Sequence, residues 1–343
     1  MEKKIRVGIN GFGRIGRAFL KIAWDNPEIE IVAVNDLGDV ANMAYLLKHD
    51  TVYRNWTHAV GSNGQEIIID EKVVKVLAIK DPSTLPWKDL DIDVVVESTG
   101  LFVTYDKANA HIKAGAKKVV ISAPAKKGED ESIKGETILL AINEDKFGTT
   151  DITSNASCTT NAASPLIGIL HEALGIEKAL LNTVHGYTAS QGIVDGPNKK
   201  DFREGRAAAQ NIVPSSTGAA IAVAKVFKDL DGLFDGISMR VPVPAGSIVD
   251  ITFIAKRDTT AEEVNNILLK ASADPKWSRI FSVTDEALVS SDILGESHAS
   301  IADLKMTRVV GGNLVKVMGW YDNEMGYTHT LVDHVIKTGK TIK

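Results

Sequence analysis

Three glycines near the amino terminus constrain the fold of this chain more than any other feature of its sequence. Gly11, Gly13 and Gly16 directly follow the apolar run 5–10 and precede a helical pattern over residues 14–24. A strand, a glycine turn and a helix in this order begin a βαβ unit, in which the glycines allow a tight turn and let the backbone approach an anionic group. We therefore expect a parallel sheet covered by helices in the amino-terminal part.

The alternation of strand and helix continues through the first half of the chain. Runs rich in Val and Ile, typical of buried parallel strands, alternate with amphipathic helical patterns. The expected strands are 5–10, 29–35, 93–97 and 118–122, and the expected helices are 14–24, 40–48 and 106–115. This pattern predicts a Rossmann domain, a doubly wound parallel sheet with helices on both faces.

After about residue 153 the strands become longer and alternate between apolar and polar residues, which is typical of a mixed or antiparallel sheet with one covered face. The expected strands include 179–184, 247–256 and 307–320, and the expected helices are 159–174, which Pro165 should kink or shorten, 216–227 and 261–272. We expect α/β architecture throughout: a dinucleotide-binding domain over 1–153, a catalytic α+β domain over 154–321, and a final helix at about 322–343 that packs back on the first domain.

Size and composition agree with two domains of a globular protein. The chain has 343 residues, of which 44% are hydrophobic and 24% charged. Its net charge of −5 lacks the positive field that non-specific binding of nucleic acid requires. No secretion signal is visible and no run of about 18 apolar residues occurs, so we expect a cytoplasmic protein with no membrane partner.

The second strand ends in an acidic residue that bears on the choice of cofactor. Asp36 follows the last glycine of the turn by about 20 residues, where a carboxylate can accept hydrogen bonds from the ribose hydroxyls of a dinucleotide. A carboxylate at that place would repel the additional phosphate of NADP, so NAD is the expected cofactor. The alternative is that Asp36 only caps the end of the strand.

The chain contains one cysteine, Cys158, which excludes an internal disulfide and any thiolate-rich metal site; no metal is expected. It lies among Ser, Thr and Asn residues at the start of a helical run, where the helix amino terminus should stabilise a thiolate. The alternative is a small buried hydrophobe. We interpret Cys158 as a nucleophile.

A thiolate nucleophile requires a base nearby, and His185 is the candidate among eight histidines. It ends the apolar strand 179–184 and opens the stretch 187–207, a Gly-, Pro- and Lys-containing loop long enough to suggest a function. From the residues alone, a packed core histidine is the favoured alternative. The others are expected at the surface of helices (His111, His171, His329, His334) or in loops and strand starts (His49, His58, His298).

At these residues the sequence resembles the glyceraldehyde-3-phosphate dehydrogenases. The blocks that carry the resemblance are NGFGRIGR, SNASCTTN, VHGYT, RAAAQNIVPSSTGAA, RVPVP and WYDNEMGY, in the order and spacing of that family. The resemblance implies that Cys158 attacks an aldehyde to form a thiohemiacetal while His185 accepts the proton. Oxidation by NAD then gives a thioester, which inorganic phosphate converts to 1,3-bisphosphoglycerate.

The resemblance also implies binding residues. Thr188 and Arg240 would hold the substrate phosphate, and Ser157, Thr159, Thr217 and Gly218 the attacking phosphate. Besides the glycine turn and Asp36, the cofactor would contact Arg14, Ile15, Lys80, Ser98, Thr99, Ser122 and Asn323. The alternatives are a salt bridge for Arg240, turn and cap roles for the threonines, and a solvated charge for Lys80.

The chain departs from the family pattern at a few positions. Glu204 stands where several bacterial relatives have an arginine, which leaves a role for Arg203 or Arg206 open. Ala162 replaces a common second cysteine, Met325 a usual aromatic residue, and Gly186 a common alanine.

Family members are homotetramers with the long loop at a subunit interface, and we expect the same here. The alternative functions are an erythrose-4-phosphate dehydrogenase and, in a different class, a catalytically idle NAD-binding interaction protein.

Overall fold

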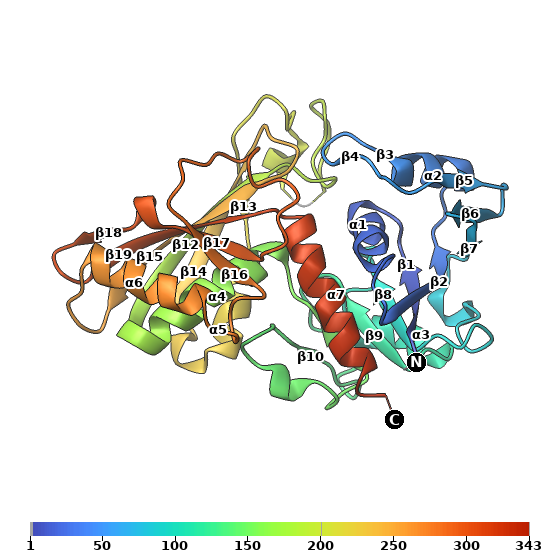
Figure 1. The fold of residues 1–343 in the computed structure, drawn as a ribbon, viewed down its shortest axis with the longest axis horizontal. Coiled ribbons are helices and arrows are strands. Elements are labelled where there is room, and N and C mark those ends of the chain that lie inside the picture. The colour runs from blue at the N-terminus through green and yellow to red at the C-terminus, as the bar shows by residue number, and fades with distance from the viewer. Residues whose placement is uncertain (1–2, 200, 343) are drawn as a thin grey trace. The chain divides into compact units, whose positions relative to one another are not determined.

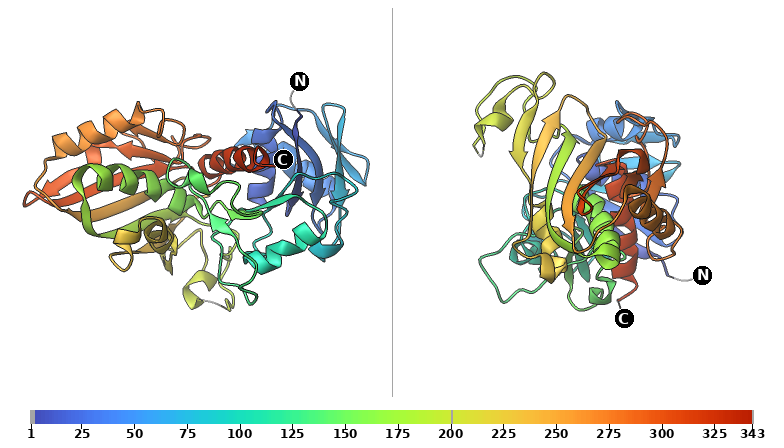
Figure 2. Two further views of the ribbon diagram at one scale, coloured as in Figure 1. Left: turned by 90° about the horizontal axis from the view of Figure 1, so that it is seen from below. Right: turned by 90° about the vertical axis from the view of Figure 1, so that its left-hand side faces the viewer.

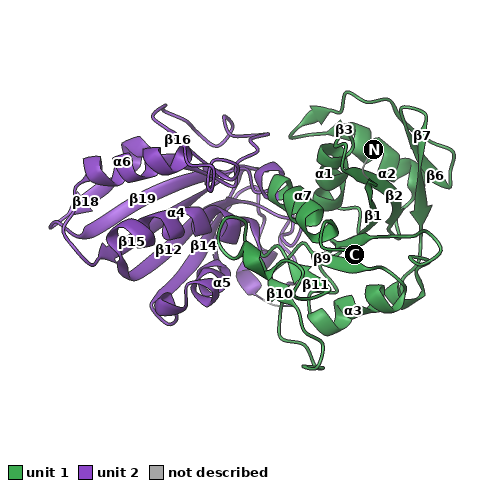
Figure 3. Ribbon diagram, turned by 60° about the horizontal axis from the view of Figure 1, so that its bottom comes forward, with its two compact units in different colours: residues 1–156, 328–343 green, residues 157–327 purple. Residues whose placement is uncertain are grey.

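The computed structural model describes residues 3–199 and 201–342. The chain divides into two compact units, which Figure 3 colours separately: unit 1 comprises residues 1–156 and 328–343, and unit 2 comprises residues 157–327. Within the described part of the chain, no helix combines the length and apolarity needed to cross a bilayer. The domain limits expected from the sequence, 1–153 and 154–321, remain a prediction about independently folding parts.

Unit 1 is built on one sheet with the strand order β10-β11-β9-β8-β1-β2-β7-β6-β5. All neighbours from β10 to β7 are parallel, and β7, β6 and β5 are antiparallel. The strands are β1 (Ile5–Asn10), β2 (Ile29–Asn35), β5 (Val60–Ser62), β6 (Glu66–Ile69), β7 (Lys72–Leu77), β8 (Val94–Glu97), β9 (Lys118–Ile121), β10 (Glu136–Thr137) and β11 (Ile152–Ser154); β3 (His49–Asp50) and β4 (Arg54–Asn55) form a separate pair.

The helices of unit 1 are α1 (Arg14–Ala23), α2 (Val40–Lys48), α3 (Tyr105–Lys113) and most of α7 (Met325–Gly339). In Figure 1, β1 lies between β2 and β8. The connection through α1 leads from β1 to one side, and that through α3 leads from β8 to the other, so right-handed crossovers place these two helices on opposite faces of the sheet. The predicted doubly wound sheet is confirmed, with its switch point beside β1.

Burial explains why these segments form strands. Every residue of β8 and β9 is buried, as the uninterrupted Val- and Ile-rich runs predicted. Val95 of β8 and Val119 of β9 belong to one apolar cluster with Trp87. The antiparallel strands β5, β6 and β7 lie in a part of the chain for which the sequence pattern predicted no helix or strand.

Unit 2 contains a mixed sheet in the order β13-β14-β12-β15-β19-β17-β16, with β18 paired to β19. Its strands are β12 (Ile176–Gly186), β13 (Val213–Ser216), β14 (Phe234–Val241), β15 (Ser247–Ala255), β16 (Phe281–Thr284), β17 (Ser300–Asp303), β18 (Arg308–Val310) and β19 (Leu314–Tyr321), and its helices are α4 (Cys158–Leu174), α5 (Ala219–Val226) and α6 (Ala261–Ser272). Alternate residues of β15 are buried, and Figure 2 shows the helices on one face of the sheet. The other face is open, as the alternation predicted.

Two expectations about unit 2 are wrong. The segment 307–320 is not one strand, because Gly311 and Gly312 have φ values of 61° and 84° and turn the chain between β18 and β19. Such left-handed conformations favour glycine, so the Gly-Gly pair was the available signal. Helix α4 is not shortened at Pro165. All its residues from Thr159 to Leu170 are buried, and this packing outweighs the hydrogen bond that proline cannot donate.

Candidate active site and dinucleotide site

Cys158 is the first residue of α4 and is part-buried. The preceding Ser157 caps the helix, because its hydroxyl accepts a hydrogen bond from the Thr160 backbone N–H at 3.1 Å. This cap fixes the direction in which the helix starts and therefore the place of the sulfur. The Cys158 Sγ lies 3.4 Å from the His185 Nε2, so the fold brings these two residues into contact.

His185 lies near the end of β12 and is 3% exposed. The parallel neighbour β14 places Arg240 directly opposite it in register. The imidazole Nδ1 lies 2.6 Å from the Gly186 carbonyl oxygen and 2.6 Å from the Arg240 Nη1. The carbonyl favours the tautomer that carries hydrogen on Nδ1 and leaves Nε2 free to accept a proton from sulfur, whereas the guanidinium favours the opposite tautomer.

The electrostatics of the pair differ from the expected thiolate. Burial raises the pKa of the Cys158 thiol, and the Arg240 charge and hydrogen bonds from Thr159 only partly offset this effect. Burial, with a further contribution from Arg240, lowers the pKa of His185 from 6.5 to about 3. Removal from water thus outweighs the helix terminus. The resting pair is a thiol beside a neutral imidazole, which is able to accept the thiol proton as the sulfur reacts.

The hydroxyl groups expected at the phosphates lie on three segments of unit 2. Thr159 follows the cysteine in α4, and its Oγ1 lies 2.9 Å from the Tyr321 hydroxyl. Thr188 lies in the loop after β12, with its Oγ1 3.0 Å from the Ser190 Oγ. Thr217 precedes α5, and its Oγ1 accepts a hydrogen bond from the Ala219 N–H at 3.2 Å.

Gly218 is the residue that caps α5, and nothing lies within 4 Å of a Cβ added to it. An anion can therefore approach this backbone closely.

Three charged residues lie at the start of the RAAA segment or just before it, and the structure gives each a different environment. Arg206 forms an ion pair with Asp195, with 2.9 Å between Nε and Oδ2. The Glu204 carboxylate accepts a hydrogen bond from the Ser215 hydroxyl at 2.7 Å, and Arg203 is exposed. Glu204 therefore connects its own turn to β13.

In unit 1 the three glycines have three different environments. Gly11 has φ 94°, and an added Cβ would lie 2.7 Å from the backbone of Ser98 and Thr99. A Cβ on Gly16 would lie 2.1 Å from the Gly11 carbonyl oxygen, whereas nothing lies within 4 Å of one on Gly13. The outer glycines are required by packing, and Gly13 leaves the open backbone that a pyrophosphate would approach.

The Asp36 carboxylate lies at the end of β2 and also holds the glycine turn. It accepts hydrogen bonds from the Phe12 N–H at 2.7 Å and from the Gly38 N–H at 2.9 Å. These bonds fix the carboxylate in the position expected to meet a ribose. The strand-end cap and the binding role are therefore compatible.

The remaining residues expected at the cofactor are placed as follows. Arg14 begins α1 and forms an ion pair with Asp50, Ile15 follows it, Lys80 is exposed after β7, Ser98 and Thr99 follow β8, Ser122 follows β9, and Asn323 lies in unit 2, where its side-chain oxygen accepts hydrogen bonds from Gly246 and Ser247. The Arg14 guanidinium would have to leave Asp50, or share it, to contact a phosphate. Among the described residues no group of three or more His, Cys, Asp or Glu is arranged to hold a metal ion.

Two histidines expected at the surface are buried, and that expectation is wrong. His111 in α3 and His334 in α7 both have 0% exposure. His334 lies 2.8 Å from the Thr153 Oγ1 and 3.1 Å from the Asn155 Oδ1, so both ring nitrogens have partners. Both histidines have polar neighbours in the sequence, which wrongly indicated that these positions of α3 and α7 face solvent.

Tyr321 is a site residue that sequence reasoning did not single out. It is 1% exposed, and its hydroxyl contacts both Thr159 and Thr183 at 2.9 and 2.8 Å. Its place in the block WYDNEMGY was the available signal.

Comparison with known proteins decides the family. The model "Glyceraldehyde 3-phosphate dehydrogenase, NAD binding domain" matches residues 5–105, and the corresponding C-terminal domain model matches residues 157–323. The chain belongs to the glyceraldehyde-3-phosphate dehydrogenase family. The resemblance inferred from the six sequence blocks is confirmed, as is the expected fold class.

Curated relatives match over nearly the whole chain. Glyceraldehyde-3-phosphate dehydrogenases of Streptomyces coelicolor and Mycolicibacterium smegmatis are each 47% identical, covering 98% of this chain and 99% of their own. That of Geobacillus stearothermophilus is 46% identical and covers 96% of both chains. Membership of the glyceraldehyde-3-phosphate dehydrogenase family therefore extends over both units.

Proposed function

We propose that this chain oxidises and phosphorylates D-glyceraldehyde 3-phosphate to 1,3-bisphosphoglycerate with NAD as cofactor, a reaction of glycolysis and gluconeogenesis. The observation that carries the proposal is the 3.4 Å contact between the only thiol sulfur of the chain and the His185 imidazole, in a chain of this family. The curated relatives are named for the same activity. Neither alternative function is favoured by them.

Cys158 acts as the nucleophile and His185 as its base. As the sulfur forms a bond to the aldehyde carbon, its proton passes to Nε2, which burial and Arg240 keep unprotonated at neutral pH. The imidazolium then donates to the developing oxyanion. Covalent attachment divides a difficult oxidation with phosphorylation into two easier steps, because the thioester retains the free energy of oxidation until phosphate attacks it.

The two-step reaction requires two anion sites. Arg240 and Thr188 hold the phosphate of the substrate, and the hydroxyls of Ser157, Thr159 and Thr217 with the Gly218 backbone hold the attacking phosphate. The open backbone at Gly218 and the guanidinium beside His185 support this assignment. When a substrate phosphate draws Arg240 toward itself, the imidazole loses a competing partner at Nδ1.

Unit 1 holds NAD. The open backbone at Gly13 is the cradle that a pyrophosphate fits, the Asp36 carboxylate receives the adenosine ribose, and Arg14, Ile15, Lys80, Ser98 and Thr99 complete the adenine half. Ser122 and Asn323 orient the nicotinamide half. NAD supplies the acceptor for the electron pair and hydrogen removed from the thiohemiacetal carbon.

The decisive experiment follows absorbance of reduced cofactor with glyceraldehyde 3-phosphate, in one arm with and in the other without inorganic phosphate. Rapid turnover that depends on phosphate supports the proposal. Replacement of the sulfur in Cys158→Ser should lower kcat by at least roughly a thousandfold, because a hydroxyl is far less nucleophilic than the thiol. Turnover by this variant near the wild-type rate would contradict the assignment of Cys158 as the nucleophile.

The same assay separates the alternatives. An erythrose-4-phosphate dehydrogenase would prefer the four-carbon aldehyde and show weak phosphate dependence. An idle interaction protein would bind NAD without turnover.

We also propose a cytoplasmic homotetramer, whose long loop 187–207 lies beside a neighbouring subunit. The open face of the unit 2 sheet supports self-association. Leu180, Ile237 and Leu314 on this face are large apolar side chains with 68%, 51% and 42% exposure, which is costly in a monomer.

A further inference from the structure

Three neighbouring parallel strands of unit 1 end in a buried polar residue. β1 ends at Asn10, β2 at Asn35 and β8 at Glu97, with 2%, 5% and 1% exposure. Burying such groups is costly unless each is hydrogen-bonded. All three are at the carboxyl edge of the sheet, the edge at which the glycine turn leaves β1, and none of them belongs to the reaction described above.

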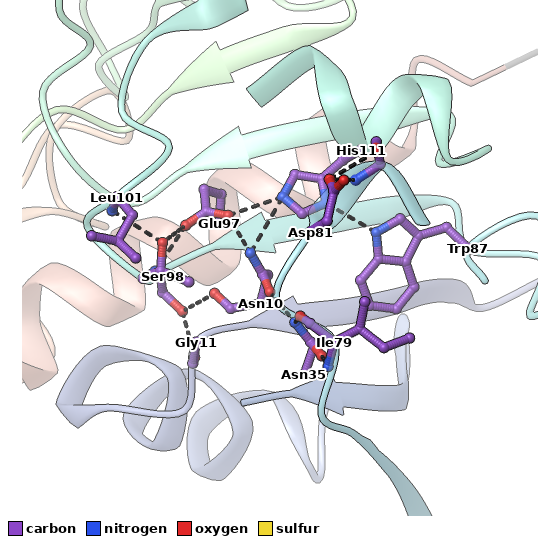
Figure 4. A network of polar contacts seen from close by, with 12 residues as sticks. Asn10, Gly11, Asn35, Ile79, Asp81, Trp87, Glu97, Ser98, Leu101 and His111 are labelled. Atoms are coloured by element: carbon purple, nitrogen blue, oxygen red, sulfur yellow. Dashed lines mark hydrogen bonds and ion pairs between the residues drawn. The ribbon is translucent and has the colours of Figure 1, made fainter. Parts of the chain in front are cut away.

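The Glu97 carboxylate is the centre of this network, which Figure 4 shows. Its Oε2 accepts hydrogen bonds from the Asn10 Nδ2 at 2.6 Å and the His111 Nε2 at 2.9 Å. Its Oε1 accepts from both the N–H and the hydroxyl of Thr99, at 2.8 and 2.5 Å. Four donors therefore converge on two oxygens, which an ionised carboxylate accommodates.

Trp87 determines which nitrogen of His111 donates. The indole Nε1 lies 3.0 Å from the His111 Nδ1, and an indole N–H is only a donor. Nδ1 must therefore be unprotonated, so that the hydrogen is on Nε2 and points to Glu97. Both side chains are fully buried, and water cannot replace either bond.

The network reaches the glycine turn through residues 98 and 99. The Ser98 hydroxyl donates to the Gly11 carbonyl oxygen at 2.7 Å, and the backbone of Ser98 and Thr99 is the surface against which the Gly11 Cα rests. On the other side, the Asn35 carbonyl accepts a hydrogen bond from the Gly11 N–H at 2.8 Å. Movement of Glu97 would displace Thr99, and with it the support of the turn.

We infer that Glu97, held by Asn10, His111 and Trp87, is a positioning residue that keeps the glycine turn in the conformation that binds NAD. The inference rests on the proposed use of this turn for NAD. Glu97 is buried and acts through Thr99 and Gly11, so its effect should be on cofactor affinity and not on the chemical step.

Glu97→Gln is the most informative variant because it keeps the shape and removes acceptor capacity. Three of the four donors are N–H groups, which cannot reverse their direction. If the new amide nitrogen replaces Oε1 it opposes the Thr99 N–H, and if it replaces Oε2 it opposes both Asn10 and His111. Either orientation leaves buried donors without an acceptor, and the chain must shift to relieve them.

Asp93→Asn provides a matched control. Asp93 precedes the same strand, β8, is 6% exposed, and accepts hydrogen bonds from the Arg6 N–H at 2.9 Å and the Lys117 Nζ at 2.6 Å. It is a buried carboxylate at the opposite end of the strand from the glycine turn. Its loss should lower thermal stability as Glu97→Gln does, without changing affinity for NAD.

The test measures the Kd of NAD by calorimetry, together with KM for NAD and kcat, on the intact wild-type enzyme and both variants. We expect Glu97→Gln to raise Kd and KM for NAD roughly tenfold while kcat at saturating NAD stays within about twofold. We expect Asp93→Asn to leave both constants unchanged.

An unchanged Kd in folded Glu97→Gln, or an equal rise in both variants, overturns the inference. If Glu97→Gln does not fold, Trp87→Phe takes its place, because loss of the indole donor releases the His111 tautomer, and a Kd within twofold of wild type then overturns the inference. Failure of the wild-type enzyme to bind NAD would instead contradict the proposed cofactor.

Discussion

At the scale of single residues, the active site depends on the opposed demands made on one imidazole nitrogen. The Gly186 carbonyl and the Arg240 guanidinium both lie 2.6 Å from the His185 Nδ1. One acceptor and one cation cannot both be satisfied by the same tautomer. The position of Arg240 therefore influences whether Nε2 is ready to receive a proton from the sulfur.

Replacement of Arg240 by Gln should raise the pKa of His185. The guanidinium is the second cause, after burial, that lowers this pKa to about 3, and removal of a neighbouring charge typically shifts a pKa by roughly one unit or more. The imidazole resonances of the folded protein, followed by NMR against pH, measure the change. Arg257→Gln, which removes an exposed arginine paired with Glu263, is the control, and equal titration curves in all three proteins would refute the role of Arg240.

The sequence identified the residues of this pair but not their charge states. Cys158 could be found because a lone cysteine among small polar residues precedes an apolar helix, and His185 because a strand ends there. The pKa directions depend on desolvation and on Arg240, which lies 55 residues from His185 in the chain and meets it only through the pairing of β12 with β14. No local pattern contains that information.

At the scale of elements, the turn from β1 to α1 assigns separate tasks to its glycines. Gly16 is needed for packing, because a Cβ there would lie 2.1 Å from a carbonyl oxygen, whereas Gly13 has free space around it. Stability and cofactor binding should therefore respond to different glycines of the same motif.

Gly16→Ala should destabilise unit 1 by roughly 1–3 kcal/mol, the usual cost of overpacking. Gly13→Ala should change stability by about 0.5 kcal/mol or less and yet weaken NAD binding at least roughly tenfold, because the methyl group occupies the approach to the pyrophosphate. Thermal melts and calorimetric titration of both variants measure the two effects. Strong NAD binding by Gly13→Ala would show that the pyrophosphate lies elsewhere.

Buried histidines on β12 and α7 make stability depend on pH. Burial lowers the pKa of His334 from 6.5 to about 3, and His185 has a similarly low value. Between pH 6.5 and about pH 3 the unfolded chain binds protons at these histidines that the folded chain does not bind. The free energy of unfolding is therefore greatest above about pH 6.5 and falls as the pH decreases.

Each of these histidines should cost ~2 kcal/mol of stability between pH 7 and pH 5. Urea unfolding at the two pH values measures the loss. In His334→Gln the loss of stability between pH 7 and pH 5 should be smaller by the ~2 kcal/mol that one histidine contributes. The variant should also be less stable than wild type at pH 7, because Thr153 and Asn155 lose a partner. An identical pH dependence in wild type and variant would rule out His334 as a source.

Most elements could be predicted from their patterns, and the errors have physical causes. β1, β2, α2 and α6 have the expected bounds because glycines, caps and periodicity agree at those places. The single strand expected over 307–320 is wrong because a Gly-Gly turn divides it, and α4 continues through Pro165 because burial outweighs a local preference. The buried contact of His111 with Glu97 follows from the packing of α3 on the sheet, which a single sequence does not reveal.

At the scale of the whole molecule, the open sheet face of unit 2 is the feature that bears on assembly. Antiparallel pairing places Leu180, Thr252 and Lys316 in one row across β12, β15 and β19. A hollow of about 450 Å³ on this face is bordered by Leu180, Leu233 and Leu314. Apolar side chains at the centre with charged neighbours suit contact with a second copy of the same face.

Leu180→Glu should dissociate the proposed tetramer into smaller species, because it buries a charge in the contact. Leu269→Glu is a suitable control, since Leu269 is a comparably exposed leucine (52%) on α6 and not on the sheet. Sedimentation velocity at micromolar concentration distinguishes the species. A wild-type enzyme that is active and monomeric would contradict the assembly, and a tetrameric Leu180→Glu would exclude this face.

The part-buried position of the single thiol, at the start of α4, has a practical consequence. A thiol-directed probe with one ¹⁹F label could attach at one atom in each subunit and nowhere else on the chain. Its stoichiometry would count competent centres in a preparation, and its resonance would report separately on ligands arriving at either anion position. The enzyme can thus be labelled at one site per subunit without removal of other cysteines.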